Sequence, residues 1–280
     1  MLNLKSKPSD KIYTDFLVSN EEFRLELWKN GILKTIPVPE NLGEYYKSED
    51  YISHTDRKVT VQEKIYQLIK RYMLNQKAAW IEKEVKKGKL LDYGCGTGDF
   101  VQHMNSRGWN SFGVEPDHDA RQLAKGKSAN IFSSVEEVRQ EKFSVITLWH
   151  VLEHVPDYSK LLQELIQKLD KNGILVIAVP NHESFDAKYY QNFWAAWDVP
   201  RHLWHFSRRG VKEEIISQFP LKLVKEKPLI FDSFYVSLLS EKYKGNGTSF
   251  LNAIKIGLQS NLKAKTTGEY SSLAYFFQKL

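Results

Sequence analysis

Three glycines occupy alternate positions in the segment LLDYGCGTGDF, residues 90–100. Gly94, Gly96 and Gly98 follow a short apolar run, at the point where a strand would turn into a helix. Glycine allows backbone angles and a close ligand approach that a Cβ atom would block. The loop therefore constrains the fold strongly, because it predicts a strand, a ligand-binding turn and a helix in succession.

A series of short apolar runs around this loop predicts a parallel sheet. The runs are KLLDYG, NSFGVE, ANIFSS, FSVITLW and GILVIAVP, and segments of about 10 to 18 residues separate them. Strands that alternate with helical segments of this length are typical of βαβ units. We therefore expect a doubly wound α/β fold.

The regions outside these runs suggest how the chain is divided. Residues 1–58 show no strong period and predict an irregular N-terminal lead, with two prolines in IPVPENLGEYY. Residues 59–86 have apolar side chains at helical spacing and predict a long or broken helix. We expect one domain over residues 59–280, with an aromatic insertion at 182–207 and a helical insertion at 233–266.

Composition limits the class of protein. Apolar residues make up 42% of the chain and charged residues 26%, as in ordinary soluble domains. No apolar leader or membrane-length run is present, so we expect a cytoplasmic monomer or homodimer without a membrane span. The net charge of +6 is mild, which argues against nucleic-acid binding. Cys95 is the single cysteine, so an internal disulfide and a cysteine zinc cluster are excluded.

Two acids narrow the expected ligand. A dinucleotide fingerprint needs glycine where Asp99 stands, and a carboxylate beside a helix N-terminus would repel a pyrophosphate. The run NSFGVE ends in Glu115, whose two oxygens can accept hydrogen bonds from both hydroxyls of a ribose. The sequence therefore predicts a nucleoside ligand without a pyrophosphate and argues against NAD.

These residues resemble the class I S-adenosylmethionine-dependent methyltransferases, whose first loop has the form D-x-G-x-G-x-G and whose second strand ends in an acid. The resemblance implies a Rossmann-like sheet of seven strands, in which YSSLAYFFQKL supplies an antiparallel last strand. It also implies S-adenosyl-L-methionine as cofactor and S-adenosyl-L-homocysteine as product. The cofactor contacts that it implies are Asp92, Tyr93, Gly94, Cys95, Gly96, Glu115, Pro116, Ser133, Ser134, Leu148 and Trp149.

Further segments resemble the methyltransferases that act on small molecules such as quinone precursors, sugars and polyketides. They are LWHVLEHVPD, NGILVIAVPN and WDVPRHLWHFS. Some members carry an N-terminal zinc ribbon, but Leu27 and Asn30 stand where its cysteines would be. We therefore expect a degenerate, ribbon-like lead without zinc. The side chains expected to hold it by packing are Phe16, Phe23, Leu25 and Trp28.

The segment LWHVLEHVPD contains H-x-x-E-H, which also occurs in a class of zinc peptidases. That site needs a helix through both histidines, and Pro156 biases the preceding residue away from helical angles. A second metal hypothesis stays open, because related methyltransferases bind a divalent cation through E-x-x-E-H. Here the candidates are His150, Glu153 and His154, and His202 or His205 could approach from the aromatic segment. Such a set favours zinc or another transition metal over magnesium. We nevertheless expect no metal.

Methyl transfer requires alignment of the acceptor behind the methyl carbon, and a hydroxyl acceptor must also lose a proton. Histidine suits that task because its ordinary pKa is near 6.5. The candidate catalytic residues are His150, His202 and His205. Residues 182–207 are expected to form a lid over the acceptor, with substrate contacts from Trp194, Trp197 and Arg201. Two residues of the lead, Tyr51 and His54, are expected to close the donor side.

The sequence therefore predicts a methyltransferase that acts on a small-molecule acceptor, with a hydroxyl oxygen favoured over nitrogen or carbon. Two other classes stay open. One is a cofactor-binding protein that supports a partner enzyme without catalysis. The other is an RNA methyltransferase, for which the mild basic charge and the C-terminal lysines are the support.

Overall fold

The computed structural model describes residues 11–46, 61–138, 142–245 and 249–280, without the side chains of residues 61–66. A seven-stranded sheet lies at its centre, in the order β10-β11-β8-β7-β4-β5-β6. Its strands are β4 (Lys89–Tyr93), β5 (Asn110–Val114), β6 (Ile131–Phe132), β7 (Phe143–Trp149), β8 (Leu169–Pro180), β10 (Leu221–Pro228) and β11 (Ser272–Lys279). Strands β4 to β8 pair in parallel, and β11 is antiparallel to both β8 and β10. The predicted α/β sheet with an antiparallel last strand is confirmed.

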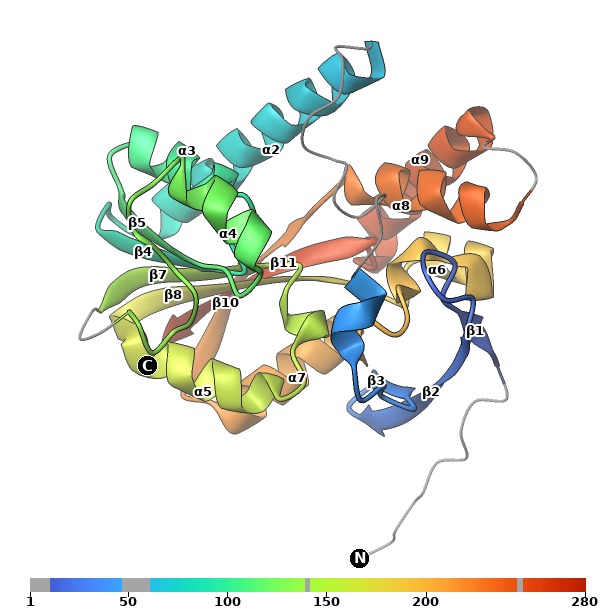
Figure 1. The fold of residues 1–280 in the computed structure, drawn as a ribbon, viewed down its shortest axis with the longest axis horizontal. Coiled ribbons are helices and arrows are strands. Elements are labelled where there is room, and N and C mark those ends of the chain that lie inside the picture. Colours follow the sequence, from blue (N-terminus) through green and yellow to red (C-terminus); the bar gives the residue numbers. More distant parts are fainter. Residues whose placement is uncertain (1–10, 47–60, 139–141, 246–248) are drawn as a thin grey trace, which may run out of the picture.

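Helices cover both faces of this sheet (Figure 1). One face carries α2 (Val61–Glu84), α3 (Asp99–Ser106) and α4 (His118–Lys125), and the other carries α5 (Tyr158–Lys168) and α7 (Arg208–Gln218). Alternate residues of a strand point to opposite faces, so Val176 of β8 packs with α2 and α3, whereas Ile177 packs with α5 and α7. Burial of each such side chain contributes about 1.5–3 kcal/mol to stability.

The N-terminal lead forms a second, antiparallel sheet. Its strands, in the order β1-β2-β3-β9, are β1 (Tyr13–Thr14), β2 (Glu22–Lys29), β3 (Ile32–Ile36) and β9 (Trp204–His205). Asn30 and Gly31, with φ of 53° and 78°, form a two-residue turn between β2 and β3, as a tight hairpin requires. The lead continues into a 3-10 turn, η1 (Leu42–Tyr46). The prediction of an irregular lead is therefore wrong for these strands.

Packing holds this second sheet in place. Phe23 and Leu25 are buried, and the Phe16 ring stacks on Phe193 at a centroid distance of 5.6 Å. Trp28 is 54% exposed, with its ring in an edge contact with Trp204 and under the Lys34 ammonium, so its prediction as an interior residue is wrong. The apolar core that the sequence predicted for the lead thus rests on the other three side chains.

The aromatic segment lies against this sheet as a packed element. It contains α6 (Phe185–Tyr190), η3 (Gln191–Phe193) and η4 (Ala195–Trp197), and it leads into β9. Its buried rings share one cluster with side chains of the lead: Tyr13, Phe23, Tyr190, Trp194 and Trp197. Most side chains of residues 182–207 are buried, so we describe this segment, which was expected to form a lid, as a packed wall.

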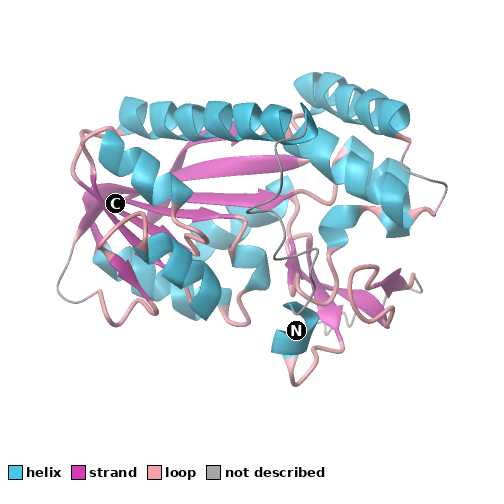
Figure 2. Cartoon of the chain, turned by 45° about the horizontal axis from the view of Figure 1, so that its top comes forward, coloured by secondary structure: helices cyan, strands magenta, loops and turns pink. Residues whose placement is uncertain are grey.

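The helical insertion consists of α8 (Asp232–Tyr243) and α9 (Phe250–Thr267), which pack on each other and on α6 (Figure 2). Both lie before β11, as the sequence predicts. Tyr51 and His54, which were expected to close the donor side, are outside the described residues. Within the described residues, no helix combines the length and apolar character that crossing a bilayer requires.

Candidate functional site

The glycine loop follows β4 at the carboxyl edge of the parallel strands. Gly94, Gly96 and Gly98 have φ of 71°, 53° and 80°, values that residues with a side chain rarely adopt. A Cβ atom on Gly94 would lie 2.4 Å from Val151, and one on Gly98 would lie 2.9 Å from Ala124. Nothing lies within 4 Å of a Cβ atom on Gly96. Gly94 and Gly98 are thus required by packing, whereas Gly96 borders open space, which we call the Gly96 cradle.

Glu115 borders the same space from the end of β5. The Gly96 N–H donates to Glu115 Oε2 at 2.7 Å, and the Asp117 N–H donates to Oε1 at 2.9 Å. Burial raises the pKa of Glu115, although these two backbone hydrogen bonds act in the opposite direction. The Arg121 guanidinium donates to the carbonyl oxygens of Glu115 and Pro116 at 2.8 and 2.7 Å, which fixes the strand end. A carboxylate is therefore held next to the Gly96 cradle.

Asp92 and Lys77 lie on the other side of the loop. Asp92 is 3% exposed and accepts a hydrogen bond from Thr147 Oγ1 at 2.6 Å. Burial raises its pKa to about 7, while the Thr147 hydrogen bond and the charge of Lys77 oppose that shift. Lys77 of α2 lies with its Nζ 4.2 Å from the centre of the Trp149 ring. Sequence reasoning missed Lys77, because a lysine on a long helix ordinarily faces solvent.

The remaining expected contacts lie along the same edge of the sheet. Leu148 is fully buried, and Tyr93 packs partly buried against the core. Cys95 is buried, which raises the pKa of its thiol. Ser133 and Ser134 follow β6, and the Ser133 hydroxyl donates to Glu137 Oε1 at 2.6 Å. The structure thus brings together the strand ends on which the donor contacts were expected. Leu148 lies beneath the site as a packing residue.

His150 directly follows β7 and has a left-handed conformation, with φ of 56°. Its Nε2 lies 2.9 Å from Asp232 Oδ2, and its Nδ1 lies 3.4 Å from Glu153 Oε1. Burial lowers the pKa of His150, but the hydrogen bond with Asp232 and the charges of both carboxylates outweigh it and raise the pKa to about 9. His150 is therefore protonated at neutral pH, which replaces the expectation that it acts alone as a base.

Asp232 is the residue that sequence reasoning missed most clearly. It is the first residue of α8 and lies 82 positions after His150 in the chain. Its side chain is 24% exposed and that of His150 is 35% exposed, so solvent reaches both. We call these two residues the His150–Asp232 pair. No local sequence pattern predicts it, because the helical insertion must first fold back onto the sheet.

The H-x-x-E-H segment contains no continuous helix. A single 3-10 turn, η2 (Leu152–His154), is followed by Val155 in an extended conformation. Helix α5 starts afresh, with Asp157 accepting a hydrogen bond from the Lys160 N–H at 2.9 Å. The break that Pro156 predicts is confirmed, and the helix that a zinc peptidase needs is not formed by this segment.

A cluster of three possible metal ligands lies beside the His150–Asp232 pair. Glu153, His154 and His202 each offer an atom within 4.8 Å of the other two. Both carboxylate oxygens of Glu153 are buried, and neither has a hydrogen-bond partner among the described residues. Burial alone would raise the pKa of Glu153, but the His150 ring, whose Nδ1 lies 3.4 Å from Oε1, lowers it, so His150 partly compensates this charge. We call this set the Glu153 cluster; its residues fit a divalent cation, although the sequence led us to expect no metal.

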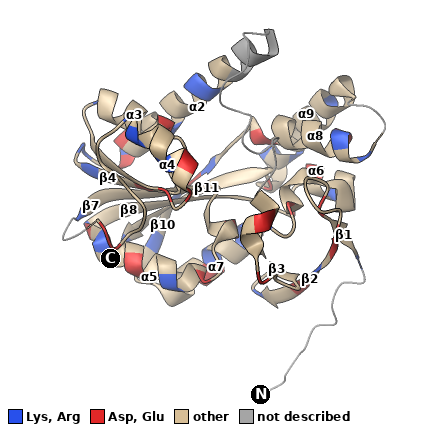
Figure 3. Cartoon of the chain, viewed as in Figure 1, with Lys and Arg blue, Asp and Glu red and all other residues tan. Residues whose placement is uncertain are grey.

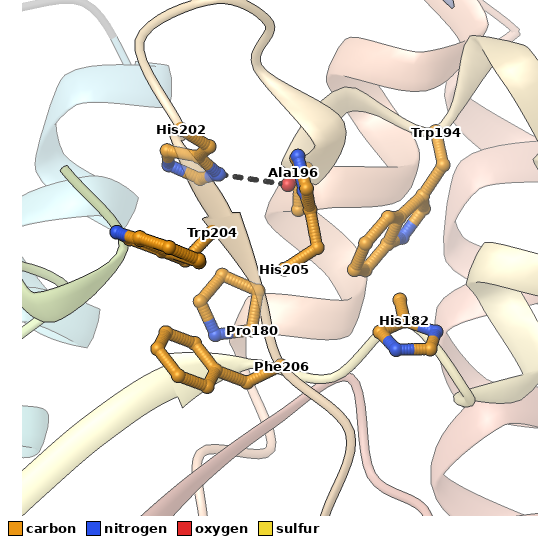
Figure 4. A pocket seen from close by; sticks show the side chains of 8 residues that line it. All are labelled: Pro180, His182, Trp194, Ala196, His202, Trp204, His205 and Phe206. Atoms are coloured by element: carbon orange, nitrogen blue, oxygen red, sulfur yellow. Dashed lines mark hydrogen bonds between the residues drawn. The ribbon is translucent and has the colours of Figure 1, made fainter. Parts of the chain in front are cut away.

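The two histidines of the Glu153 cluster are oriented for such a role. His154 Nδ1 lies 3.1 Å from the Arg201 carbonyl oxygen, and His202 Nδ1 lies 2.9 Å from that of Ala196 (Figure 4). Because a carbonyl oxygen only accepts, both Nδ1 atoms carry a proton, which leaves each Nε2 as the atom that could bind a cation. Burial lowers the pKa of His154 to about 4, so its ring is neutral at pH 7. His202 thus lies within 4.8 Å of the Glu153 carboxylate and also lines a pocket (Figure 4).

His205 has a structural position. It is 4% exposed, and its Nε2 lies 2.9 Å from Thr35 Oγ1, while the Thr35 hydroxyl donates to the His202 carbonyl oxygen at 2.7 Å. Burial lowers the pKa of His205 well below its ordinary value. We therefore reassign His205 from catalysis to the contact between β3 and β9, because its Nε2 is engaged by the Thr35 hydroxyl.

Arg201 is also enclosed. It is 1% exposed, and its guanidinium donates to Asp15 Oδ1 at 2.8 Å, to Asp198 Oδ1 at 2.7 Å and to the Tyr45 carbonyl oxygen at 2.9 Å. The two carboxylates neutralise the Arg201 charge, and all three acceptors use N–H donors of the guanidinium. We reassign Arg201 from a substrate contact to a tie between the lead and the aromatic segment.

A small pocket lies between the aromatic segment and the end of β8 (Figure 4). Its lining residues are Pro180, His182, Trp194, Ala196, His202, Trp204, His205 and Phe206. Trp194 borders this pocket and donates from its indole to Asp186 Oδ2 at 2.7 Å. Trp197 donates to the Gln191 carbonyl oxygen at 2.6 Å and lies behind the lining. Of the three expected substrate contacts, only Trp194 borders a hollow.

Comparisons with known proteins agree with this arrangement. A family model described as a methyltransferase domain matches residues 61–223. Ubiquinone biosynthesis O-methyltransferase of Actinobacillus pleuropneumoniae serotype 7 is 34% identical over 107 residues, 33% of this chain and 46% of that protein. The protein of the same name from Histophilus somni is 36% identical over 107 residues, 33% of this chain and 45% of its own. The chain thus spans about half the length of these relatives.

Solved structures share the fold at low sequence identity. Magnesium protoporphyrin IX methyltransferase from Synechocystis, with bound SAH, has a TM-score of 0.55 and 13% identity, covering 84% of this chain and 97% of its own. The plantazolicin methyltransferase in complex with SAH has a TM-score of 0.53 and 11% identity, covering 85% and 94%. These likenesses show that the sheet and its helices follow one common architecture.

Proposed function

This chain belongs to the methyltransferase domain family, and on that premise we propose that it transfers a methyl group from S-adenosyl-L-methionine to a hydroxyl oxygen of a small molecule. The Gly96 cradle carries the proposal, because it is open space at a strand end with a carboxylate, Glu115, held beside it. The names of the relatives, which are O-methyltransferases of ubiquinone biosynthesis, support oxygen as the accepting atom.

The donor is expected to lie along the glycine loop. Glu115 would exchange its hydrogen bond with the Gly96 N–H for the two hydroxyls of the ribose. Asp92, whose pKa burial raises to about 7, would accept from the amino group of the methionine part. A cationic amine would also favour the charged form of Asp92. Lys77, next to Asp92 and Trp149, would neutralise a carboxylate at the same end of the donor.

We propose that the His150–Asp232 pair takes part in the reaction of the acceptor hydroxyl. The sulfonium group of the donor supplies an activated methyl group, so the protein chiefly aligns the acceptor and takes up its proton. Asp232 is partly exposed and is held by a protonated His150, which places a carboxylate where an acceptor hydroxyl can reach it. As the C–O bond forms and the C–S bond breaks, the sulfur keeps the bonding electrons, and the hydroxyl proton would pass to the Asp232 carboxylate, because a protonated His150 has no free lone pair.

Release of S-adenosylhomocysteine is the test of this function. The full chain is incubated with S-adenosyl-L-methionine and, separately, with a small-molecule extract, an RNA fraction and buffer. We expect release with the small-molecule extract alone. Release with RNA alone would make it an RNA methyltransferase. Donor binding without release in any fraction would support the alternative, a non-catalytic cofactor-binding protein.

A second candidate function, metal-assisted methyl transfer, is favoured by the Glu153 cluster. Glu153, His154 and His202 would hold a divalent cation, and a nitrogen-rich set of this kind suits zinc or another transition metal. Such an ion would act as a Lewis acid on the acceptor hydroxyl. Elemental analysis after incubation with zinc tests it, with His202→Gln as the variant and His182→Gln, from the same pocket, as the control. One zinc per chain in the control and none in His202→Gln would support this candidate, whereas no bound zinc in the wild-type protein would exclude it.

A further inference from the structure

Helix α9 is apolar on its outer face as well as on its inner face. The inner face packs on α8 and α6 through small or apolar residues, namely Ala253, Ile256, Gly257, Ser260 and Ala264. The outer face repeats apolar side chains every three or four residues: Leu251, Ile254, Leu258 and Leu262 are 80%, 41%, 51% and 51% exposed. We call these four side chains the outer stripe of α9. An apolar row of this kind normally marks a surface that meets a partner.

The charged residues of α9 itself have one sign. The 18 residues of α9 include Lys255, Lys263 and Lys265 and no acidic residue. The turn of 100° per residue places Lys255 and Lys265 beside the stripe. On α5, by contrast, Lys160 and Lys168 alternate with an acid, and most helices show both colours of charge (Figure 3).

We propose that the outer stripe of α9 docks onto an anionic lipid surface. Apolar side chains would enter the boundary between headgroups and acyl chains, while the flanking lysines would pair with lipid phosphates. A second copy of the chain fits less well, because it would bring two sets of lysines together without an acid of α9 to pair with them. Helix α9 packs on α8, which begins at Asp232, so a docked stripe would lie one helix away from the His150–Asp232 pair.

Co-flotation of the full chain with vesicles tests this proposal. The variant Leu258→Ser/Leu262→Ser removes the C-terminal half of the stripe. Leu123→Ser/Ile216→Ser is the matched control, because those residues of α4 and α7 are 50% and 47% exposed. We expect the wild-type chain to float with vesicles of phosphatidylcholine and phosphatidylglycerol, and not with phosphatidylcholine alone. The stripe variant should bind at least about tenfold more weakly, and the control should bind like wild type.

A separate variant tests the role of the lysines that flank the stripe. Lys255→Gln/Lys265→Gln should reduce flotation, and added salt should weaken the wild-type chain towards the level of this variant. The proposal is overturned if the wild-type chain does not float at low salt, or if the stripe variant floats equally well. It is also overturned if sedimentation shows a dimer that the stripe variant dissolves, since the occupant is then a second copy. Donor binding, measured on the same variants, should not change, so failure here is distinct from failure of the proposed function.

Discussion

At the scale of single residues, two glycines form a matched pair. Gly96 and Gly245 both have positive φ, 53° and 77°, and a Cβ atom on either would meet nothing within 4 Å. Alanine should therefore strain the backbone equally at both positions, by about 1 kcal/mol. Only Gly96→Ala places a methyl group in the Gly96 cradle. We expect it to weaken donor binding by about tenfold or more in calorimetry, whereas equal affinity in both variants would contradict the position of the donor.

The His150–Asp232 pair gives a second prediction at this scale. Asp232→Asn keeps the shape of the side chain and removes its charge, so turnover should fall by about 10²–10⁴-fold. Donor affinity should stay at the wild-type value, because Asp232 lies outside the Gly96 cradle. Asp119→Asn, which changes an acid with a side chain 91% exposed on α4, is the control. Wild-type turnover in Asp232→Asn would remove the pair from the reaction.

These residues also show which contacts could be predicted from the sequence and which could not. Gly96 and Glu115 follow strands that hydrophobic patterns reveal, so their proximity could be predicted from parallel pairing of β4 with β5. Asp232 reaches His150 only after α8 folds back over 82 residues, and Lys77 is recognisable only once α2 is known to cover the sheet. Contacts of this kind depend on tertiary packing, for which the local sequence holds no signal.

At the scale of elements, the buried ion pair of Asp15 and Arg201 ties the lead to the aromatic segment. The two side chains are 0% and 1% exposed. Asp15→Asn leaves part of the Arg201 charge uncompensated in the interior, which should lower the free energy of unfolding by about 3–5 kcal/mol. Denaturant unfolding monitored by tryptophan fluorescence measures it. A loss below about 1 kcal/mol, the size expected for a surface pair, would contradict this role.

The same pair predicts a pH dependence. Burial alone would raise the pKa of Asp15, but the Arg201 hydrogen bond, backbone donors and the Arg201 charge lower it below its ordinary value of 3.8. A carboxyl group with a depressed pKa in the folded state stabilises the fold above its ordinary pKa and loses that effect as pH falls below it. The free energy of unfolding should therefore fall more steeply below about pH 4 in wild type than in Asp15→Asn. Parallel curves for the two proteins would refute this.

The elements of the lead were predicted least well. In β2, Phe23 and Leu25 are buried, while Leu27 and Trp28 are 50% and 54% exposed, so the apolar alternation does not continue through the strand. Its sheet is completed by β9, in which His205 pairs with Leu33 across the chain. Strand β9 has only two residues and its partner β3 is distant in sequence, so no periodic signal reveals the pairing. The lead was therefore expected to be irregular.

At the scale of the whole molecule, two sheets contribute to the candidate site. The parallel part of the seven-stranded sheet could be predicted from the order of apolar runs, because its strands pair mainly with neighbours in βαβ units. The number of strands and the antiparallel last strand came from the resemblance to the methyltransferases. The second sheet joins the lead to residues 182–207 and makes a packed wall beside the Glu153 cluster. Access to the acceptor side is therefore expected past α8, where the His150–Asp232 pair is partly exposed.

The central claim is that the Gly96 cradle and Glu115 bind S-adenosyl-L-methionine. Isothermal titration calorimetry of the full chain with the donor, and with S-adenosylhomocysteine, tests it most directly. We expect saturable binding of one ligand per chain in wild type. In Glu115→Ala, the loss of two hydrogen bonds to a charged group should weaken binding by about 10- to 100-fold. A folded wild-type protein that binds neither ligand, or a Glu115→Ala variant with wild-type affinity, would contradict the account.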